Sequence, residues 1–328
     1  MQSPLVQLEG RSRLPDWLRK PEKHFGALHD LKSDLRSLGL HTVCESARCP
    51  NIHECFHRGT AAFMILGDRC TRSCGFCAVR SLRSPDPPDP EEPRMVAHMA
   101  SRLGLRHVVV TSVTRDDLPD GGASHFACTV LALRETLPEA RVEVLTPDFG
   151  GDPHALAHVL DSRPHIFNHN METVARLYPR VRPQAEYRRS LDVLRFARSH
   201  APGSAIKSGL MVGLGEEAHE VERLLDDLRE AGVGIATIGQ YLQPTRENMP
   251  VVSFVPPRQF DAWRDYGISI GFQTVLSGPF VRSSYMAEMV AAAAELAERP
   301  LADARGSETA RFRAATVRER SHVAEAEC

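Results

Sequence analysis

The chain has 328 residues, 42% of them hydrophobic, which is enough for one large α/β domain or two ordinary ones. A formal net charge of −2 gives no electrostatic case for binding nucleic acid or an anionic membrane. No apolar run approaches the ~20 residues that span a bilayer. The first ten residues lack the basic-then-apolar order of a signal peptide, so we expect a cytoplasmic protein.

Three cysteines at C-x4-C-x5-C spacing, Cys44, Cys49 and Cys55, follow a polar N-terminal arm, and six of the eight cysteines lie between residues 44 and 77. A disulfide framework is one interpretation, but nothing before these cysteines indicates secretion. Clustered thiols in a cytosolic chain are more typical of metal binding or catalysis. We therefore expect this segment to be held by a metal more than by a core of its own.

A second triad follows the apolar run Ala61–Leu66, which is typical of a buried strand. Cys70, Cys74 and Cys77 have C-x3-C-x2-C spacing, with Phe76 directly before the third cysteine. A structural zinc site would need four protein ligands. Iron–sulfur cubanes are normally held by four thiolates, so three leave one iron open for chemistry. Two triads, each one ligand short, predict two clusters.

Apolar runs then alternate with amphipathic helical patterns along the chain. The further runs that we expect to be strands are 107–111, 142–146, 165–168, 205–212 and 235–241. Two helical stripes are expected to face a core: Phe126, Val130, Leu133 and Leu137 in one, and Val221, Leu224, Leu225 and Leu228 in the other. Six βα units predict a parallel sheet, either an open barrel or a doubly wound sheet, with active residues at the carboxyl ends of the strands.

The C-terminal part departs from this alternation. Residues 271–276 are a candidate further strand, and 286–296 form a helical pattern. From about Glu298 the chain is rich in Ala, Arg and Glu, and we expect a solvated or disordered tail. The predicted divisions are residues 1–58 for the arm and first triad, 59–270 for the barrel, 271–297 for the C-terminal segment and 298–328 for the tail.

The second triad resembles the signature loop of the radical S-adenosylmethionine (SAM) superfamily, and the two triads in this order resemble the lipoyl synthase family. The resemblance extends over roughly 17–287. It is carried by further segments: 110–123, 142–149, 168–173, 207–216, 239–244 and 277–285. It implies a partial (βα)6 TIM-like barrel with N-terminal and C-terminal extensions, which chooses between the two α/β arrangements.

The resemblance also implies the cofactors, which are two [4Fe–4S] clusters and SAM. Cys70, Cys74 and Cys77 would hold the cluster whose open iron chelates SAM. The auxiliary cluster, the expected sulfur source, would be held by the three upstream cysteines and by a serine of Arg282-Ser283-Ser284-Tyr285. Neighbouring residues on an extended segment point to opposite sides, so one serine can reach the iron, and the family pattern favours Ser284. A hydroxyl that caps the following helix is the alternative.

Candidate contacts to SAM come from the strand ends. They are Thr111, Ser112 and Thr114, with Glu172 for the ribose hydroxyls, and Phe76 is added from the cysteine loop. Gly209, Gly213 and Glu216 belong to a segment that resembles the glycine-bearing fifth-strand segment of radical SAM enzymes, which implies a close backbone approach to adenine. Each Ser or Thr is as readily a helix cap. Asp116 and Asp117 suit either a metal or a turn, and we expect a structural role for His169.

The activity implied is insertion of two sulfur atoms at C6 and C8 of an octanoyl chain on a lysine. The partners implied are octanoylated lipoyl carrier domains, namely 2-oxoacid dehydrogenase subunits and the glycine-cleavage H protein, and an electron donor such as flavodoxin or ferredoxin. Two alternatives stay open at this point. One is another radical SAM sulfurtransferase, such as a biotin-synthase-like enzyme, and the other is a non-catalytic iron–sulfur or zinc protein.

Overall fold

The computed structural model describes residues 6–7, 14–19, 40–43 and 51–285. Cys44, Cys49, the helix expected at 286–296 and the tail from 298 lie outside these residues. No helix in the described part of the chain is long and apolar enough to cross a membrane.

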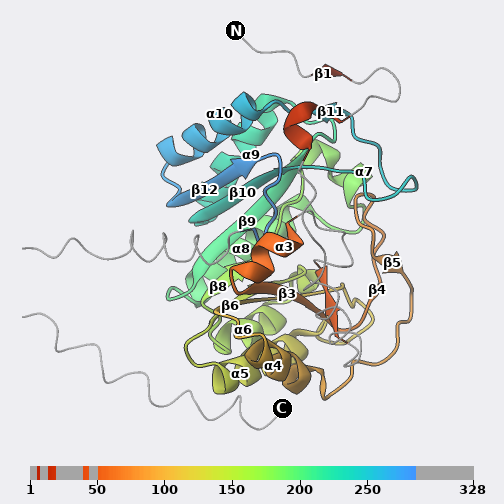
Figure 1. Ribbon diagram of the computed structural model, residues 1–328, viewed down its shortest axis with the longest axis vertical. Helices are drawn as coiled ribbons and strands as arrows, with labels where there is room; N and C mark the ends of the chain where they lie inside the picture. Colours follow the sequence, from red (N-terminus) through yellow and green to blue (C-terminus); the bar gives the residue numbers. More distant parts are fainter. Residues whose placement is uncertain (1–5, 8–13, 20–39, 44–50, 286–328) are drawn as a thin grey trace, which may run out of the picture.

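A curved sheet of eight strands forms the centre of the protein (Figure 1). Seven of the strands are parallel: β3 (Thr60–Ile65), β6 (His107–Ser112), β7 (Arg141–Leu145), β8 (Ile166–Asn168), β9 (Ala205–Val212), β10 (Ile235–Gln240) and β12 (Thr274–Gly278). They pair in chain order, as expected of a barrel with helical crossovers. The six predicted strands and the further strand are confirmed, although β12 begins three residues later than the predicted run at 271–276.

The eighth strand, β2 (His41–Thr42), pairs antiparallel with β3. Two small sheets lie beside the barrel: β1 (Val6–Gln7) with β11 (Ser253–Phe254), and β4 (Arg69–Cys70) with β5 (Arg80–Ser81). The sheet order ends at β2 on one side and β12 on the other, so within the described residues the barrel is open.

Helices follow the strands, and the longer ones cover the outer face of the sheet. The helices that follow the strands are α4 (Glu92–Arg102), α5 (Ala123–Thr136), α6 (Pro153–Asp161), α7 (Tyr178–Val181), α8 (Tyr187–His200), α9 (Ala218–Glu230) and α10 (Pro257–Ser269). Three short 3-10 turns complete the pattern: 16–18, 149–151 and 175–177. Local sequence sets several helix starts. Asp152 caps α6 ahead of Pro153, and Glu217 and Glu220 form a capping box at α9.

The core lies between the sheet and these helices, and both predicted helical stripes belong to it. Phe126, Val130 and Leu133 on α5 are fully buried, as is the stripe on α9. Each strand also alternates between two environments. Val108 and Val110 face the helical layer, whereas Val109 packs on the inner side with Ala62.

One helix, α3 (Ile52–His57), lies on the inner side of the barrel. Its Ile52 packs against Ala62 and Val109, and Figure 1 shows α3 in front of the sheet, between the helices of its two halves. The chain from 279 to 285 reaches the same region, because Asn51 Nδ2 donates a hydrogen bond of 2.7 Å to the carbonyl of Phe280. The N-terminal and C-terminal extensions therefore meet inside the open barrel.

Candidate functional site

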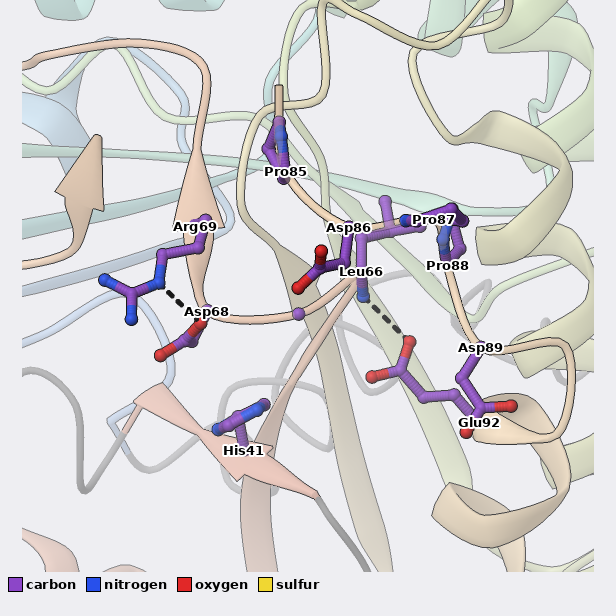
Figure 2. A pocket seen from close by; sticks show the side chains of 11 residues that line it. His41, Leu66, Asp68, Arg69, Pro85, Asp86, Pro87, Pro88, Asp89 and Glu92 are labelled. Atoms are coloured by element: carbon purple, nitrogen blue, oxygen red, sulfur yellow. Dashed lines mark hydrogen bonds and ion pairs between the residues drawn. The ribbon is translucent and has the colours of Figure 1, made fainter. Parts of the chain in front are cut away.

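The turn after β3 sets the direction in which the chain enters the cysteine loop. Leu66 is buried although it adopts a left-handed conformation with φ 67°, which is uncommon for a residue with a Cβ. Two buried charged side chains hold it: Glu92 Oε2 accepts its N–H at 2.8 Å, and Arg115 donates to its carbonyl at 3.3 Å. Figure 2 shows Glu92 reaching Leu66 at the rim of a pocket of about 150 Å³. The turn is therefore fixed from both sides before the first cysteine.

Arg72, which is 7% exposed, ties the loop to two further strand ends. It forms a two-pronged ion pair with Asp116, both contacts at 2.8 Å, and its Nη2 lies 2.7 Å from Asp148 Oδ1. Burial alone would raise the pKa of Asp148, but the hydrogen bond and charge of Arg72 lower this pKa to about 2. Asp117 pairs with Arg115 instead. Both members of the Asp116–Asp117 pair thus have arginine partners.

Backbone and amide contacts complete the clamp on the loop. Thr114 O accepts the N–H of Thr71, and Val181 O accepts that of Gly75. From the β10–β11 connection, Asn248 Nδ2 donates to Cys77 O at 2.8 Å, while Met249 N donates to Gly75 O. A Cβ at residue 75 would lie 2.8 Å from the Met249 side chain, so a larger residue there would displace that side chain from the loop.

The three thiols of the loop are half-buried and near enough to one another to interact electrostatically. Cys70 Sγ accepts N–H bonds from Arg72 at 3.4 Å and Thr114 at 3.3 Å. Burial raises the pKa of Cys74 to about 12 and that of Cys77 to about 11. No three His, Cys, Asp or Glu side chains in the described ranges converge as a single-ion site. Grouped thiols with amide donors fit a cluster, whose binding must release the thiol protons.

The predicted strand-end hydroxyls have different surroundings. Thr111 is buried and its hydroxyl donates to Leu145 O at 2.8 Å on the neighbouring strand. Ser112 Oγ is buried without a hydrogen-bond partner among the described residues. Thr114 acts through its backbone, which holds both Thr71 and Cys70. Phe76 is half-buried and packs against the main core.

Glu172 lies beside the cysteines, just beyond β8. It adopts a left-handed conformation with φ 65° and forms a parallel bridge with Leu210 of β9. Burial raises the pKa of its carboxyl group, and the charge of Arg182 opposes that effect. Glu172 also interacts electrostatically with both Cys74 and Cys77. The structure therefore brings this predicted residue together with the cysteine loop.

Arg182 is a site residue that the sequence reasoning missed. It is 8% exposed, its Nη1 donates to the carbonyl oxygens of Asn170 and Met171, and its charge opposes the rise that burial causes in the pKa of Cys74. Its Nε has no hydrogen-bond partner within the described chain. A buried guanidinium N–H without an acceptor fits an anionic group of a ligand. Arg182 lies outside every motif considered, so no sequence pattern marked it.

Other buried polar atoms at these strand ends also lack partners among the described residues: Thr146 Oγ1, Asn168 Oδ1, His169 Nε2 and Thr173 Oγ1. His169 donates through Nδ1 to Thr146 O at 2.9 Å, and burial lowers the pKa of its ring to about 4. The neutral ring therefore leaves Nε2 as a buried acceptor. Buried polar groups are normally paired, so this set fits a polar cofactor or substrate at the barrel mouth.

The glycines of the predicted SAM-binding segment are packed closely against side chains of the neighbouring strand β10. A Cβ at Gly209 would lie 2.4 Å from Thr237 Oγ1, and one at Gly213 would lie 2.1 Å from Gln240 Nε2. The carboxylate of Glu216 accepts the N–H groups of Gly213 and Leu214 and so closes its own turn. Their contact with SAM stays a prediction.

Cys55 on α3 is 8% exposed and lies beside the C-terminal segment. Tyr285 donates its hydroxyl to Glu54 on the same helix, at 3.2 and 3.3 Å from the two carboxylate oxygens, and interacts electrostatically with Cys55. One cysteine of the first triad and the Ser283–Tyr285 turn are thus neighbours, although they are separated by more than two hundred residues of sequence.

Comparison with known proteins shows which family the chain belongs to. Residues 3–49 match the model of the N-terminal domain of lipoyl synthase of the radical SAM family, and residues 64–228 match the radical SAM superfamily model. The chain is 53% identical over 284 residues to lipoyl synthase from Rubrobacter xylanophilus, which covers 87% of this chain and 88% of that relative. The chain belongs to the lipoyl synthase family. Its cofactors are accordingly two [4Fe–4S] clusters and SAM.

A second lipoyl synthase, from Nitratidesulfovibrio vulgaris, is 54% identical over 276 residues, 84% of this chain and 92% of that relative. Two solved structures share the fold at low identity. Methylornithine synthase has a TM-score of 0.51 at 14% identity, covering 73% of this chain and 72% of that one. HydG, a maturase of the [FeFe]-hydrogenase, has a TM-score of 0.52 at 13% identity, covering 78% and 56%. The predicted partial barrel is confirmed.

Proposed function

We propose that this chain inserts two sulfur atoms at C6 and C8 of an octanoyl chain carried on a lysine of a lipoyl carrier domain. The observation that carries the proposal is the meeting of Cys55 and the Ser283–Tyr285 turn inside a barrel whose mouth bears the second cysteine triad. Unactivated C–H bonds are beyond the reach of side-chain acids and bases, so a cofactor must supply the chemistry. Two separate cysteine sites in one barrel suit a reaction that needs both a radical and a sulfur source.

Cys70, Cys74 and Cys77 would hold the cluster that binds SAM. Cys44, Cys49 and Cys55, with Ser284, would hold the auxiliary cluster. When bound, the clusters and SAM supply the radical that removes hydrogen from the octanoyl chain and the sulfur that replaces it. The role of the protein chain is to orient the clusters and SAM and to enclose them.

The chain holds SAM, in this proposal, with groups that already lie at the barrel mouth. The unpartnered Nε of Arg182 suits the carboxylate of the methionine part, since a guanidinium pairs readily with carboxylates. Glu172 would accept from the ribose hydroxyls, and Ser112 has a hydroxyl without a partner in the described chain. Thr111 would contribute shape more than a hydrogen bond, because its hydroxyl is engaged with Leu145 O.

Ser284 suits the iron better than Ser283. The Ser283 hydroxyl donates to Asn170 Oδ1 at 2.6 Å and accepts from Asn168 Nδ2 at 3.3 Å, so it is engaged in both roles. Ser284 is half-buried and makes no side-chain hydrogen bond to the described residues. A serine oxygen is a harder ligand than a thiolate and a weaker anchor for iron, which suits a cluster that must give up sulfur.

The partners that follow are octanoylated lipoyl carrier domains in general. We propose 2-oxoacid dehydrogenase subunits and the glycine-cleavage H protein as carriers, and flavodoxin or ferredoxin as the electron donor. Clustered cysteines that bind metal are typical of reducing compartments, so we propose the cytoplasm as the site of action.

The function is tested by anaerobic incubation of the reconstituted protein with SAM, a reductant and an octanoyl-lysyl peptide. Mass spectrometry is expected to find peptide that has gained two sulfur atoms, together with 5′-deoxyadenosine. Product with one added sulfur and no further conversion would contradict double insertion. Formation of 5′-deoxyadenosine without any sulfur-containing peptide would contradict the proposed substrate.

A further inference from the structure

The backbone of the C-terminal segment lies in a notch on the inner side of two neighbouring strands. A Cβ at Gly239 of β10 would lie 2.1 Å from Val281 O, and one at Gly209 of β9 would lie 3.1 Å from Ser283 Oγ. Thr237, the register partner of Gly209, is two residues before Gly239, so the two glycines are diagonal neighbours on the same face of the sheet. We call Gly209 and Gly239 the glycine notch. A side chain at Gly239 would exclude the carbonyl of Val281, and one at Gly209 would crowd the hydroxyl of Ser283.

Inside the notch, the side chain of Ser283 is held by two asparagines, Asn168 at the end of β8 and Asn170 just beyond it. The Ser283 hydroxyl donates a hydrogen bond to Asn170 Oδ1 and accepts one from Asn168 Nδ2. A hydroxyl bound in both directions cannot rotate without losing a hydrogen bond in a half-buried environment. The side chain of Ser283 is therefore oriented by the barrel and not by solvent.

The asparagines are themselves held rigidly. Asn168 Nδ2 shares its two N–H groups between Ser283 and Glu143 Oε1, the latter at 2.9 Å. Glu143 is fully buried and receives Lys207 Nζ at 2.8 and 3.1 Å. On the other side, Asn170 Nδ2 donates to Glu172 Oε1 at 3.0 Å. A continuous hydrogen-bond chain thus runs from a buried ion pair, through Ser283, to the carboxylate assigned to SAM.

Ser284 lies between two anchored neighbours. Ser283 is anchored to the barrel through the asparagines, and Tyr285 is anchored to α3 through Glu54, beside Cys55. Once its two neighbours are fixed, the Ser284 backbone has little freedom, and its hydroxyl is presented without spending binding energy on ordering the segment. The contacts of Ser283 and Tyr285 with the rest of the chain thus set the geometry of the segment.

We propose that Ser283 is the positioning residue of the auxiliary site, which orients Ser284 by docking on Asn168 and Asn170 in the glycine notch. The proposal rests on the proposed function, specifically on Ser284 as the auxiliary ligand. Ser283 itself touches no iron in this account. Its removal should therefore loosen the auxiliary cluster and leave the SAM cluster in place.

The test is the rate at which iron passes from the anaerobic, fully reconstituted chain to a chelator. Iron release should have two kinetic phases, one for each cluster. The Cys55→Ala variant should lack the auxiliary cluster, so the phase that remains in it belongs to the SAM cluster. Ser283→Ala is expected to accelerate the auxiliary phase about tenfold, which corresponds to ~1.4 kcal/mol for its lost hydrogen bonds. Asn170→Ala, which removes the acceptor, should act in the same direction.

The matched control is Ser204→Ala. Ser204 is a buried serine at the start of β9, where its hydroxyl donates to Pro164 O at 2.7 Å, far from the segment along the strand. This variant should leave both phases unchanged. The far-ultraviolet circular dichroism spectrum of each variant reports whether the barrel has folded, and Ser283→Ala should keep the wild-type spectrum while its ratio of lipoyl product to 5′-deoxyadenosine falls.

Each outcome has a distinct meaning. If Ser284→Ala accelerates the auxiliary phase and Ser283→Ala does not, the positioning role is wrong while the ligand assignment stands. If Ser284→Ala leaves that phase at the wild-type rate, the ligand assignment in the proposed function is wrong. Equal acceleration of both phases by Ser283→Ala would show a general loss of structure and would also overturn the proposal.

Discussion

Replacing Arg72 with glutamine isolates the contribution of the buried ion pair that holds the cysteine loop against the barrel. Arg72 is nearly inaccessible, and Asp148, one of its partners, is fully buried. Removing one member of a buried pair leaves an uncompensated charge, which typically costs 3–5 kcal/mol. Arg189, with Nη1 at 3.6 Å from Asp148 Oδ2, offsets part of this loss. We therefore expect Arg72→Gln to lower the free energy of unfolding by about 3 kcal/mol, the lower end of that range.

The assay is urea unfolding followed by circular dichroism, with all variants at equal iron content because bound clusters themselves stabilise the folded chain. Arg69→Gln is the matched control. It lies next to the loop, but its ion pair with Asp68, drawn in Figure 2, is partly exposed to solvent, and exposed pairs contribute about 0–1 kcal/mol.

A second variant tests the cause of the loss. Adding Asp148→Asn to Arg72→Gln removes the stranded charge, so the double variant should recover much of the lost stability. If Arg72→Gln unfolds within 1 kcal/mol of the Arg69→Gln control, about the limit for a surface pair, the buried pair does not hold the loop as reasoned here.

Three further predictions concern the two cysteine sites. Cys74→Ala should abolish both 5′-deoxyadenosine and lipoyl product, measured by chromatography and mass spectrometry, and reductive SAM cleavage at the wild-type rate would exclude this triad as the SAM-cluster site. Cys55→Ala should keep at least part of the 5′-deoxyadenosine formation and lose the lipoyl product; normal product would exclude Cys55 from the sulfur source. Asn248→Ala should speed iron release from the SAM cluster by up to about tenfold, because a side-chain bond to the Cys77 carbonyl is lost, and unchanged release would remove Asn248 from the clamp.

The parallel strands were predictable because each is a short continuous apolar run between helical patterns. Ala205–Val212 was predicted without error, and the other five strands within one residue at either end. The seventh strand was placed less well, since Thr274–Gly278 includes Ser277 and ends on glycine. Its pairing with β10 comes from the barrel as a whole, which no local pattern records.

The site was predictable where chemistry needs a rare residue at a fixed spacing, as the cysteines show. It was not predictable where a common residue acts through the fold. Arg182 and Asn248 reach the cysteine loop from distant turns, and nothing nearby in sequence distinguishes them from the arginines and asparagines of the surface. The glycines illustrate the same limit, because Gly239 is required by the carbonyl of Val281, a contact set by the tertiary structure. The boundaries after residues 58, 270 and 297 stay predictions.

The most direct test of the central claim, that Ser284 completes the auxiliary cluster beside Cys55, is Mössbauer spectroscopy of the ⁵⁷Fe-reconstituted chain without SAM. A hard oxygen ligand should give one iron a signal distinct from those of iron bound by sulfur alone. We expect Ser284→Cys to remove that signal while keeping the cluster, and Ser204→Ala to leave it unchanged. A Ser284→Cys spectrum identical to the wild-type spectrum would contradict the account.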